Sequence, residues 1–111
     1  MRTRRGDIVI VAAPGDYGKP RPAVIVQSDA IPDSHASVII CQMTSELVEA
    51  DFRITIEPEP ETGLQVVSQI MADKPVAIRR ERIGQRVGRL PANAMSQLIA
   101  AIAFVMGLAD A

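Results

Sequence analysis

The chain has 111 residues, the size of one domain, so we expect residues 1–111 to form a single unit. Its formal net charge is -1, which is not typical of a protein that coats nucleic acid. Aromatic residues make up only 3% of the chain, too few for a platform on which bases stack. If RNA binds here, charge and hydrogen bonds must provide most of the recognition.

Arginine side chains gather in two segments, residues 2–5 and 79–89, and acidic side chains dominate residues 46–61 between them. A locally basic face can attract phosphate even when the overall charge is close to zero. Both clusters can equally be ordinary solvated faces, and the composition alone leaves the two interpretations open.

The lone cysteine, Cys41, lies in an apolar run, so we interpret it as a core residue in a reducing compartment. No signal peptide is visible, because Asp7 interrupts the first apolar stretch. The uncharged residues 98–109 are shorter than the roughly 20 residues that a membrane span needs. We therefore expect a cytoplasmic protein without a membrane partner.

Short β-strands are expected along most of the chain, separated by segments rich in proline and glycine. They are predicted at residues 6–13, 21–28, 37–43, 51–57, 64–71, 75–80 and 83–90. The continuous apolar run within 21–28 indicates a strand buried on both faces, whereas the strict alternation in 51–57 indicates a half-exposed strand. The polar residues 31–36 form a connection.

Two polar positions border these strands. Pro22 restricts Arg21 to an extended conformation, which holds Arg21 at the mouth of its strand. Thr44 and Ser45 follow the third strand, where its apolar pattern stops.

Residues 91–108 are rich in alanine, methionine, leucine and isoleucine and predict a helix, with Pro91 at its start and Gly107 at its end. Apolar side chains cover most of its circumference, so the helix is either deeply buried or shared between two subunits. In so short a chain a second subunit is the simpler explanation. Strands followed by one closing helix predict an α+β fold with an antiparallel, barrel-like sheet.

An ordered set of segments resembles the MazF/PemK/Kid toxins over roughly residues 5–108. The set comprises Arg5-Gly6-Asp7-Ile8-Val9, Arg21-Pro22-Ala23-Val24-Ile25-Val26-Gln27, Thr44-Ser45, Gly63-Leu64, residues 68–74 and Gly88-Arg89-Leu90 with the helix after it. The resemblance implies a small SH3-like β-barrel of the CcdB/MazF type and a symmetric homodimer. It further implies cleavage of single-stranded mRNA and neutralisation by a cognate antitoxin protein.

Metal-free RNA cleavage uses the neighbouring 2′-hydroxyl as nucleophile, and the protein must stabilise the charge that develops on the phosphoryl oxygens. Arg21 falls on the family's catalytic arginine; its planar, permanently charged fork suits phosphate clamping and makes it a poor base. Thr44 falls on the family's threonine, whose hydroxyl can bind the scissile phosphate, with Ser45 as a weaker companion.

Further candidates are expected to contact the substrate. Gln69 and Asp73 are candidates for base recognition or for lining the groove, and Arg79 could guide RNA or the acidic tail of an antitoxin. His35 has a suitable intrinsic pKa for acid–base work but lies outside every family motif. No cluster has metal-ligand spacing, so we expect neither metal nor cofactor. Pro75 and Ala77 depart from the usual family pattern, so the cleavage sequence cannot be carried over.

Two other functions fit the same fold: a CcdB-like poison that binds DNA gyrase without cutting RNA, and a non-enzymatic small-barrel interaction module. Arg21 and Thr44 argue against the gyrase poison, because a pure binder has no need of that pair, and the interaction module stays open.

Overall fold

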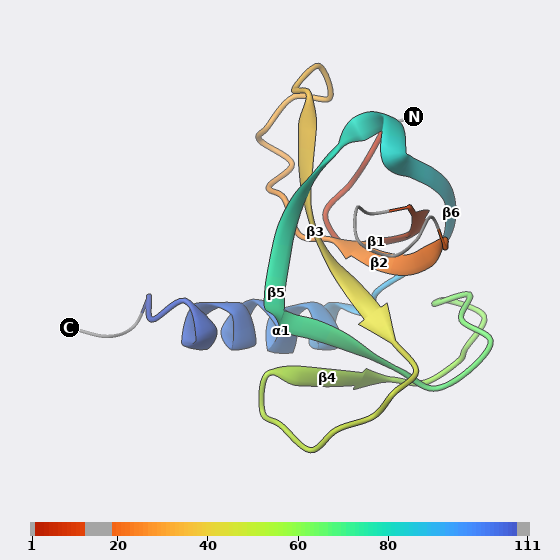
Figure 1. Cartoon of the computed structure of the whole chain (residues 1–111), viewed down its shortest axis with the longest axis vertical. Helices are drawn as coiled ribbons and strands as arrows, with labels where there is room; N and C mark the ends of the chain where they lie inside the picture. Colours follow the sequence, from red (N-terminus) through yellow and green to blue (C-terminus); the bar gives the residue numbers. More distant parts are fainter. Residues whose placement is uncertain (1, 13–18, 109–111) are drawn as a thin grey trace.

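A computed structural model of the chain describes residues 2–12 and 19–108 (Figure 1). Its elements are β1 (Asp7–Val11), β2 (Arg21–Ile25), β3 (Ser37–Thr44), β4 (Arg53–Ile56), β5 (Ser68–Arg79), a 3-10 turn η1 (Arg80–Arg82), β6 (Ile83–Arg89) and the helix α1 (Ala92–Val105). The strands form one antiparallel sheet in the order β4-β5-β3-β2-β1-β6. An antiparallel sheet followed by a C-terminal helix confirms the predicted α+β class.

The sheet curls strongly, but its ends do not meet in the described structure (Figure 1). β4 and β6 are its two edges, and neither pairs with the other. The closed barrel expected from the sequence is therefore not confirmed.

The two strands predicted at residues 64–71 and 75–80 are a single bent strand, β5, and that prediction was wrong. In the β3–β5 register Met43 lies opposite Ile70 and Cys41 opposite Pro75, so β5 holds extra residues at an irregularity. Pro75 cannot donate to the ladder, and the polar residues before it interrupt the apolar pattern. The local sequence therefore suggests a break where the strand only bulges and bends.

Buried side chains form two clusters, one on each face of the curled sheet. Ile8, Val24 and Met43 pack towards Leu98 of α1, whereas Val9 and Ile25 belong to the cluster on the other face. Successive residues of a strand point to opposite faces, so both clusters draw on the same strands. The prediction that the second strand is buried on both faces is confirmed.

The helix α1 packs one face on the sheet through Ala94, Met95, Leu98 and Ala101. Phe104, Met106 and Leu108 remain exposed towards its C-terminal end, which projects past the sheet in Figure 1. Deep burial is therefore not the reason for its apolar circumference. No helix in the described part of the chain is long and apolar enough to cross a membrane.

Candidate active site

A pocket of roughly 350 Å³ opens where β2 begins and β3 ends. This β2–β3 pocket is lined by Lys19, Pro20, Arg21, Pro22, Met43, Thr44, Ser45, Val66 and Ser68. β2 and β3 run antiparallel with Ala23 opposite Gln42, so the first residue of β2 meets the last residue of β3 at one edge. Arg21 and Thr44 are thereby brought to one pocket.

At the β2–β3 pocket, the hydroxyl oxygen of Thr44 holds the backbone that follows β3. Thr44 Oγ1 accepts a hydrogen bond from the backbone N–H of Glu46 at 3.1 Å. Because that bond uses the oxygen as an acceptor, the hydroxyl hydrogen is directed elsewhere and can serve as a donor. Thr44 is half-buried, whereas Arg21 and Ser45 are exposed at the pocket. The site thus offers a guanidinium, hydroxyl groups and the ammonium of Lys19 to a ligand.

Gln69 does not line this pocket, although it lies opposite Thr44 in the β3–β5 register. Its side chain is buried and bound to the backbone of Val48 and to Thr55. Its amide groups are thus used within the chain, and a substrate contact by Gln69 stays a prediction.

Asp73 also lies outside the β2–β3 pocket, in an ion pair with Arg53. Arg53 Nε donates to Asp73 Oδ1 at 2.9 Å, and Nη2 donates to Oδ2 at 3.4 Å. Burial favours a higher pKa for Asp73, but the hydrogen bonds to Arg53 and to its own backbone N–H, with the charges of Arg53 and Lys74, together outweigh it. The pKa of this carboxyl therefore lies below its ordinary value. A substrate contact by Asp73 stays a prediction.

The remaining candidates lie at the other end of β3. Arg79 is exposed and pairs with Ser37 at the first residue of that strand. Arg80 donates through Nε to the carbonyl of His35 at 2.9 Å, and His35 is exposed in the loop before β3. The structure therefore does not bring Arg79 or His35 together with Arg21. Their predicted roles stay predictions.

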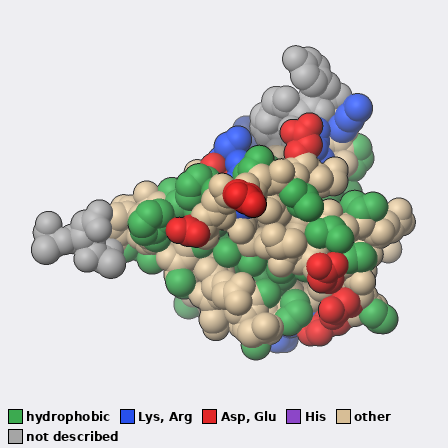
Figure 2. All heavy atoms as spheres, turned by 90° about the horizontal axis from the view of Figure 1, so that it is seen from below, with side chains coloured by type: hydrophobic (Ala, Val, Ile, Leu, Met, Phe, Trp, Pro, Cys, Tyr) green, Lys and Arg blue, Asp and Glu red, His purple; other side chains and the backbone are tan. Residues whose placement is uncertain are grey.

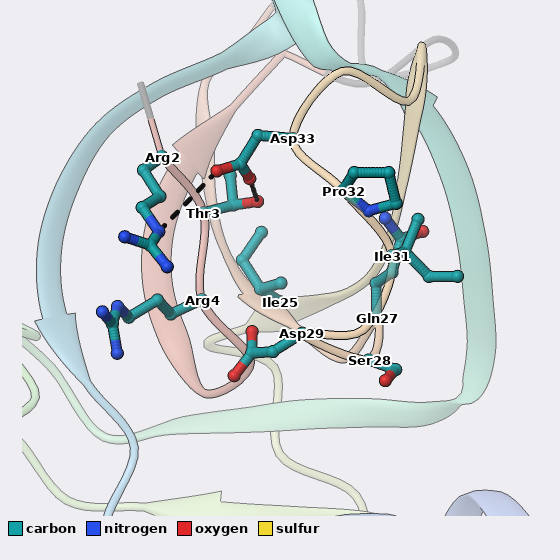
Figure 3. Close-up of a pocket in the computed structure, with 10 residues that line it drawn as sticks. All are labelled: Arg2, Thr3, Arg4, Ile25, Gln27, Ser28, Asp29, Ile31, Pro32 and Asp33. Carbon is teal, nitrogen blue, oxygen red and sulfur yellow. Dashed lines mark hydrogen bonds and ion pairs between the residues drawn. The ribbon is translucent and has the colours of Figure 1, made fainter.

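A second hollow, of roughly 320 Å³, lies beyond the other end of β2 (Figure 3). Its two carboxylates already have partners. Asp33 accepts from Thr3 and pairs with Arg2, and Asp29 accepts from the backbone N–H of Arg5 at 2.8 Å. These contacts fasten the N-terminal segment to the loop after β2. Across the described residues, no group of three or more histidine, cysteine, aspartate or glutamate side chains could hold a metal ion.

Six of the nine residues that line the β2–β3 pocket were not predicted as site residues, among them Lys19, Val66 and Ser68. Lys19 lies just before the strand that begins at Arg21, so its charge was a local signal. Val66 and Ser68 arrive from a distant part of the chain, and nothing in their local sequence points to the pocket.

Comparison with known proteins identifies the family. Residues 4–106 match the family described as PemK-like, MazF-like toxin of type II toxin-antitoxin system. The chain belongs to this family. A relative from Mycolicibacterium smegmatis, named "Probable endoribonuclease MazF", is 44% identical over 108 residues, which are 96% of this chain and 98% of that protein.

Solved structures of MazF-type proteins share the fold. A mycobacterial endoribonuclease in complex with its cognate antitoxin has a TM-score of 0.82 at 19% identity, over 96% of this chain and 97% of that one. The Mycobacterium tuberculosis toxin MazF-mt6 has a TM-score of 0.80 at 20% identity, over 91% and 96%. MazF from Deinococcus radiodurans also has a TM-score of 0.80, at 19% identity over 96% and 98%.

Proposed function

We propose that this member of the MazF/PemK family is a cytoplasmic endoribonuclease that cleaves single-stranded mRNA without a metal. The observation that carries the proposal is the convergence of Arg21 and Thr44 on the β2–β3 pocket. A 44% identical relative that spans the same length carries the name of an endoribonuclease, which supports the reaction class.

In the proposed reaction the 2′-oxygen of the substrate attacks the adjacent phosphorus, and the bond from phosphorus to the 5′-oxygen breaks. The 2′-hydroxyl loses its proton and the leaving 5′-oxygen gains one, so the products are a 2′,3′-cyclic phosphate and a 5′-hydroxyl. Arg21 stabilises the charge on the phosphoryl oxygens through its planar, permanently charged fork. Arg21 can also pass a proton to the leaving oxygen, and the proton released by the 2′-hydroxyl then restores the charge of the guanidinium.

Thr44 acts in this scheme as a hydrogen-bond donor to the phosphate. Its oxygen already accepts from the backbone of Glu46, and its O–H remains to bind a phosphoryl oxygen and fix the phosphate in line with the 2′-oxygen. Ser45 supplies a second hydroxyl and Lys19 a second positive charge at the same pocket.

We propose that the protein acts as a homodimer bound in turn by an antitoxin. An apolar surface where β3 and β5 meet α1 includes Val26, Ile39, Val76, Ile102 and Met106. Ile39 and Val76 are each 42% exposed, so this surface is open in a single chain and suits burial against a second copy. A structural neighbour was solved with its cognate antitoxin, which supports a similar partner here.

Cleavage of a mixed RNA pool in the presence of a chelator tests the activity, with the ends of the products mapped chemically. We expect discrete cuts that leave 2′,3′-cyclic phosphates and 5′-hydroxyls. Arg21→Ala should lower kcat/KM by about 100-fold or more, since one well-placed charge donor contributes about 3 kcal/mol to the transition state. Arg2→Ala removes the same charge at the far end of β2 and should have little effect.

Other outcomes would overturn the proposal. Intact RNA together with stalled gyrase would favour the CcdB-like poison, and inertness in both assays would favour a non-enzymatic module. Equal loss of activity in Arg21→Ala and Arg2→Ala would remove the special role of the pocket.

A further inference from the structure

We infer that Gln69 is a positioning residue that fixes the hydroxyl of Thr44 through the loop after β3. The inference rests on the proposed function, because it assigns Gln69 a role in that reaction. It gives the buried amide of Gln69 a task within the chain, in place of a direct contact with an RNA base.

Gln69 binds both backbone groups of one residue in the loop 45–50. Its Oε1 accepts from the N–H of Val48 at 3.0 Å, and its Nε2 donates to the carbonyl of Val48 at 3.0 Å. The same Nε2 donates to Thr55 Oγ1 at 3.2 Å. The amide therefore pairs with Val48 as a neighbouring strand would, although Val48 lies outside every strand.

The position of Gln69 in the sheet explains why it can reach the loop. It lies opposite Thr44 on β3 and opposite Thr55 on β4, so it sits between the two strands that the loop connects. Only 6% of Gln69 is exposed. A buried amide whose donor and acceptor are both used holds its partners in one arrangement, because leaving either group unpaired is costly.

Apolar packing does little to hold the loop itself in the described structure. Leu47 and Val48, its large apolar residues, are 53% and 48% exposed. The hydrogen bonds to Gln69 are therefore a principal anchor of the segment that carries Glu46. Because the N–H of Glu46 binds Thr44 Oγ1, the path from Gln69 to the site runs through Val48 and Glu46 to the Thr44 hydroxyl.

Two substitutions at Gln69 remove different numbers of its side-chain hydrogen bonds. Gln69→Ala removes all three hydrogen bonds of the side chain. Gln69→Glu keeps an acceptor for the N–H of Val48 but loses the donor and sets a carboxylate against the carbonyl of Val48. Both variants should free the loop and misplace the hydroxyl. We expect kcat to fall about 10- to 100-fold, as small displacements in a reactive geometry do, with KM little changed.

Gln27 offers a matched control at the other end of β3. Its Oε1 accepts from the N–H of Ile39 at 3.2 Å, and its Nε2 donates to the carbonyl of Ser37 at 3.4 Å. Gln27→Ala removes the same kind of amide clamp far from the β2–β3 pocket. It should lower thermal stability to a similar degree and leave kcat unchanged.

A double-mutant cycle with Thr44→Ala identifies the path. If Gln69 acts through Thr44, Gln69→Ala lowers kcat in the wild-type background and has no further effect when Thr44 is already alanine. The inference would be overturned if Gln69→Ala lowered kcat by the same factor in both backgrounds. It would also be overturned if Gln27→Ala lowered kcat as much as Gln69→Ala does.

Amide hydrogen exchange of Glu46, followed by NMR in wild type and Gln69→Ala, tests the same path without RNA. Faster exchange at Glu46 in the variant supports the inference, and unchanged exchange overturns it. If wild type cleaves no RNA, the proposed function fails, and the exchange rate of Glu46 alone decides whether Gln69 fixes Thr44.

Discussion

The ion pair between Arg53 and Asp73 gives a stability prediction with a defined pH dependence. In wild type, Arg53 donates to both carboxylate oxygens of Asp73, with the shorter bond at 2.9 Å. Asp73→Asn keeps the shape of the side chain but removes its charge and one acceptor oxygen. The guanidinium of Arg53, with its side chain 12% exposed, would then lose its charged partner.

The magnitude follows from the burial of the pair. Hydrogen bonds to charged groups contribute about 1.5–3 kcal/mol, and the 22% exposure of the Asp73 side chain places this pair towards the lower half of that range. We expect a loss of about 2 kcal/mol in the free energy of unfolding. At roughly 2.1 cal/mol/K of unfolding entropy per residue, a chain of 111 residues should lose about 9 °C in Tm.

The difference between wild type and Asp73→Asn should depend on pH in one direction. The folded-state pKa of Asp73 lies below its ordinary value of 3.8, so the ion pair contributes fully above that value. Its contribution is lost as the pH falls through the folded-state pKa. Thermal unfolding of both proteins by circular dichroism from pH 3 to pH 8 should therefore give a constant gap in Tm near neutrality that narrows in acid.

Asp51→Asn is the matched control, because Asp51 is an exposed carboxylate just before β4, the strand that begins with Arg53. It should change Tm by less than about 2 °C, as isolated surface substitutions usually do. The reasoning would be refuted if wild type and Asp73→Asn had the same Tm at pH 7, or if their difference in Tm widened in acid. The same variant tests the predicted substrate contact, since loss of a base contact should raise KM with kcat unchanged.

Three further predictions concern the core, the loop before β5 and the apolar surface. Burial, with a smaller contribution from the charge of Asp73, raises the pKa of the Cys41 thiol to about 12, so iodoacetamide at pH 8 should label Cys41 only after unfolding. Gly88→Ala should lower the free energy of unfolding by about 3 kcal/mol in a denaturant titration, because its Cβ would lie 2.1 Å from the carbonyl oxygen of Thr62. Gly84→Ala should lower it less, because its Cβ would lie 3.1 Å from the nearest atom. Val76→Glu should convert a dimer to a monomer by sedimentation, and an unchanged mass would exclude this surface as the interface.

The pairing of Arg21 with Thr44 is the part of the site that the sequence could predict. Each residue marks the end of a β-rich run, and consecutive strands usually pair antiparallel, so a strand start and the next strand's end meet. The family resemblance pointed to the same two residues. The structure brings both to one pocket, as that reasoning required.

Val66 and Ser68 could not be predicted, because long-range contacts place the segment before β5. Thr62 is buried, and its hydroxyl binds backbone groups of Glu57 and Glu59 within the same loop. The loop then rests against β6, where Gly88 has no Cβ to keep it away. Local patterns carry no information about which distant glycine will accept such a contact.

The burial of Gln69 could not be read from its local sequence. Gln69 was singled out because an amide can read a base, and its neighbours Ser68 and Ile70 give no sign of what covers it. The strand β5 lies between β3 and β4, and the loop joining those strands covers the amide. Burial of Gln69 is therefore a property of the topology, which the local sequence does not contain.

The first part of the family motif has a structural task, distinct from the site. Asp7 is buried; it accepts from the N–H of Arg4 at 2.9 Å and pairs with Arg89 at 2.9 Å. Gly6, with φ of 94°, accepts from the N–H of Leu90 and donates to the carbonyl of Ile25. Gly6 and Asp7 thus join β1, β2 and the end of β6, whereas Arg21, from the second segment of the motif, lines the β2–β3 pocket.

Three arginines of the second basic cluster have structural uses. Arg80 and Arg89 bind the N-terminal segment and the buried Asp7, and Arg82 donates to the carbonyl of Ala12 at 2.9 Å. Much of the positive charge near the end of the sheet therefore stabilises the fold. Several acidic side chains lie among hydrophobic and uncharged ones on the face seen from below in Figure 2, and the segments on either side of β4 are acidic. In the proposed complex, RNA affinity depends on few cations, with Arg21 and Lys19 at the pocket, because a chain with a net charge of -1 can bind phosphate only locally.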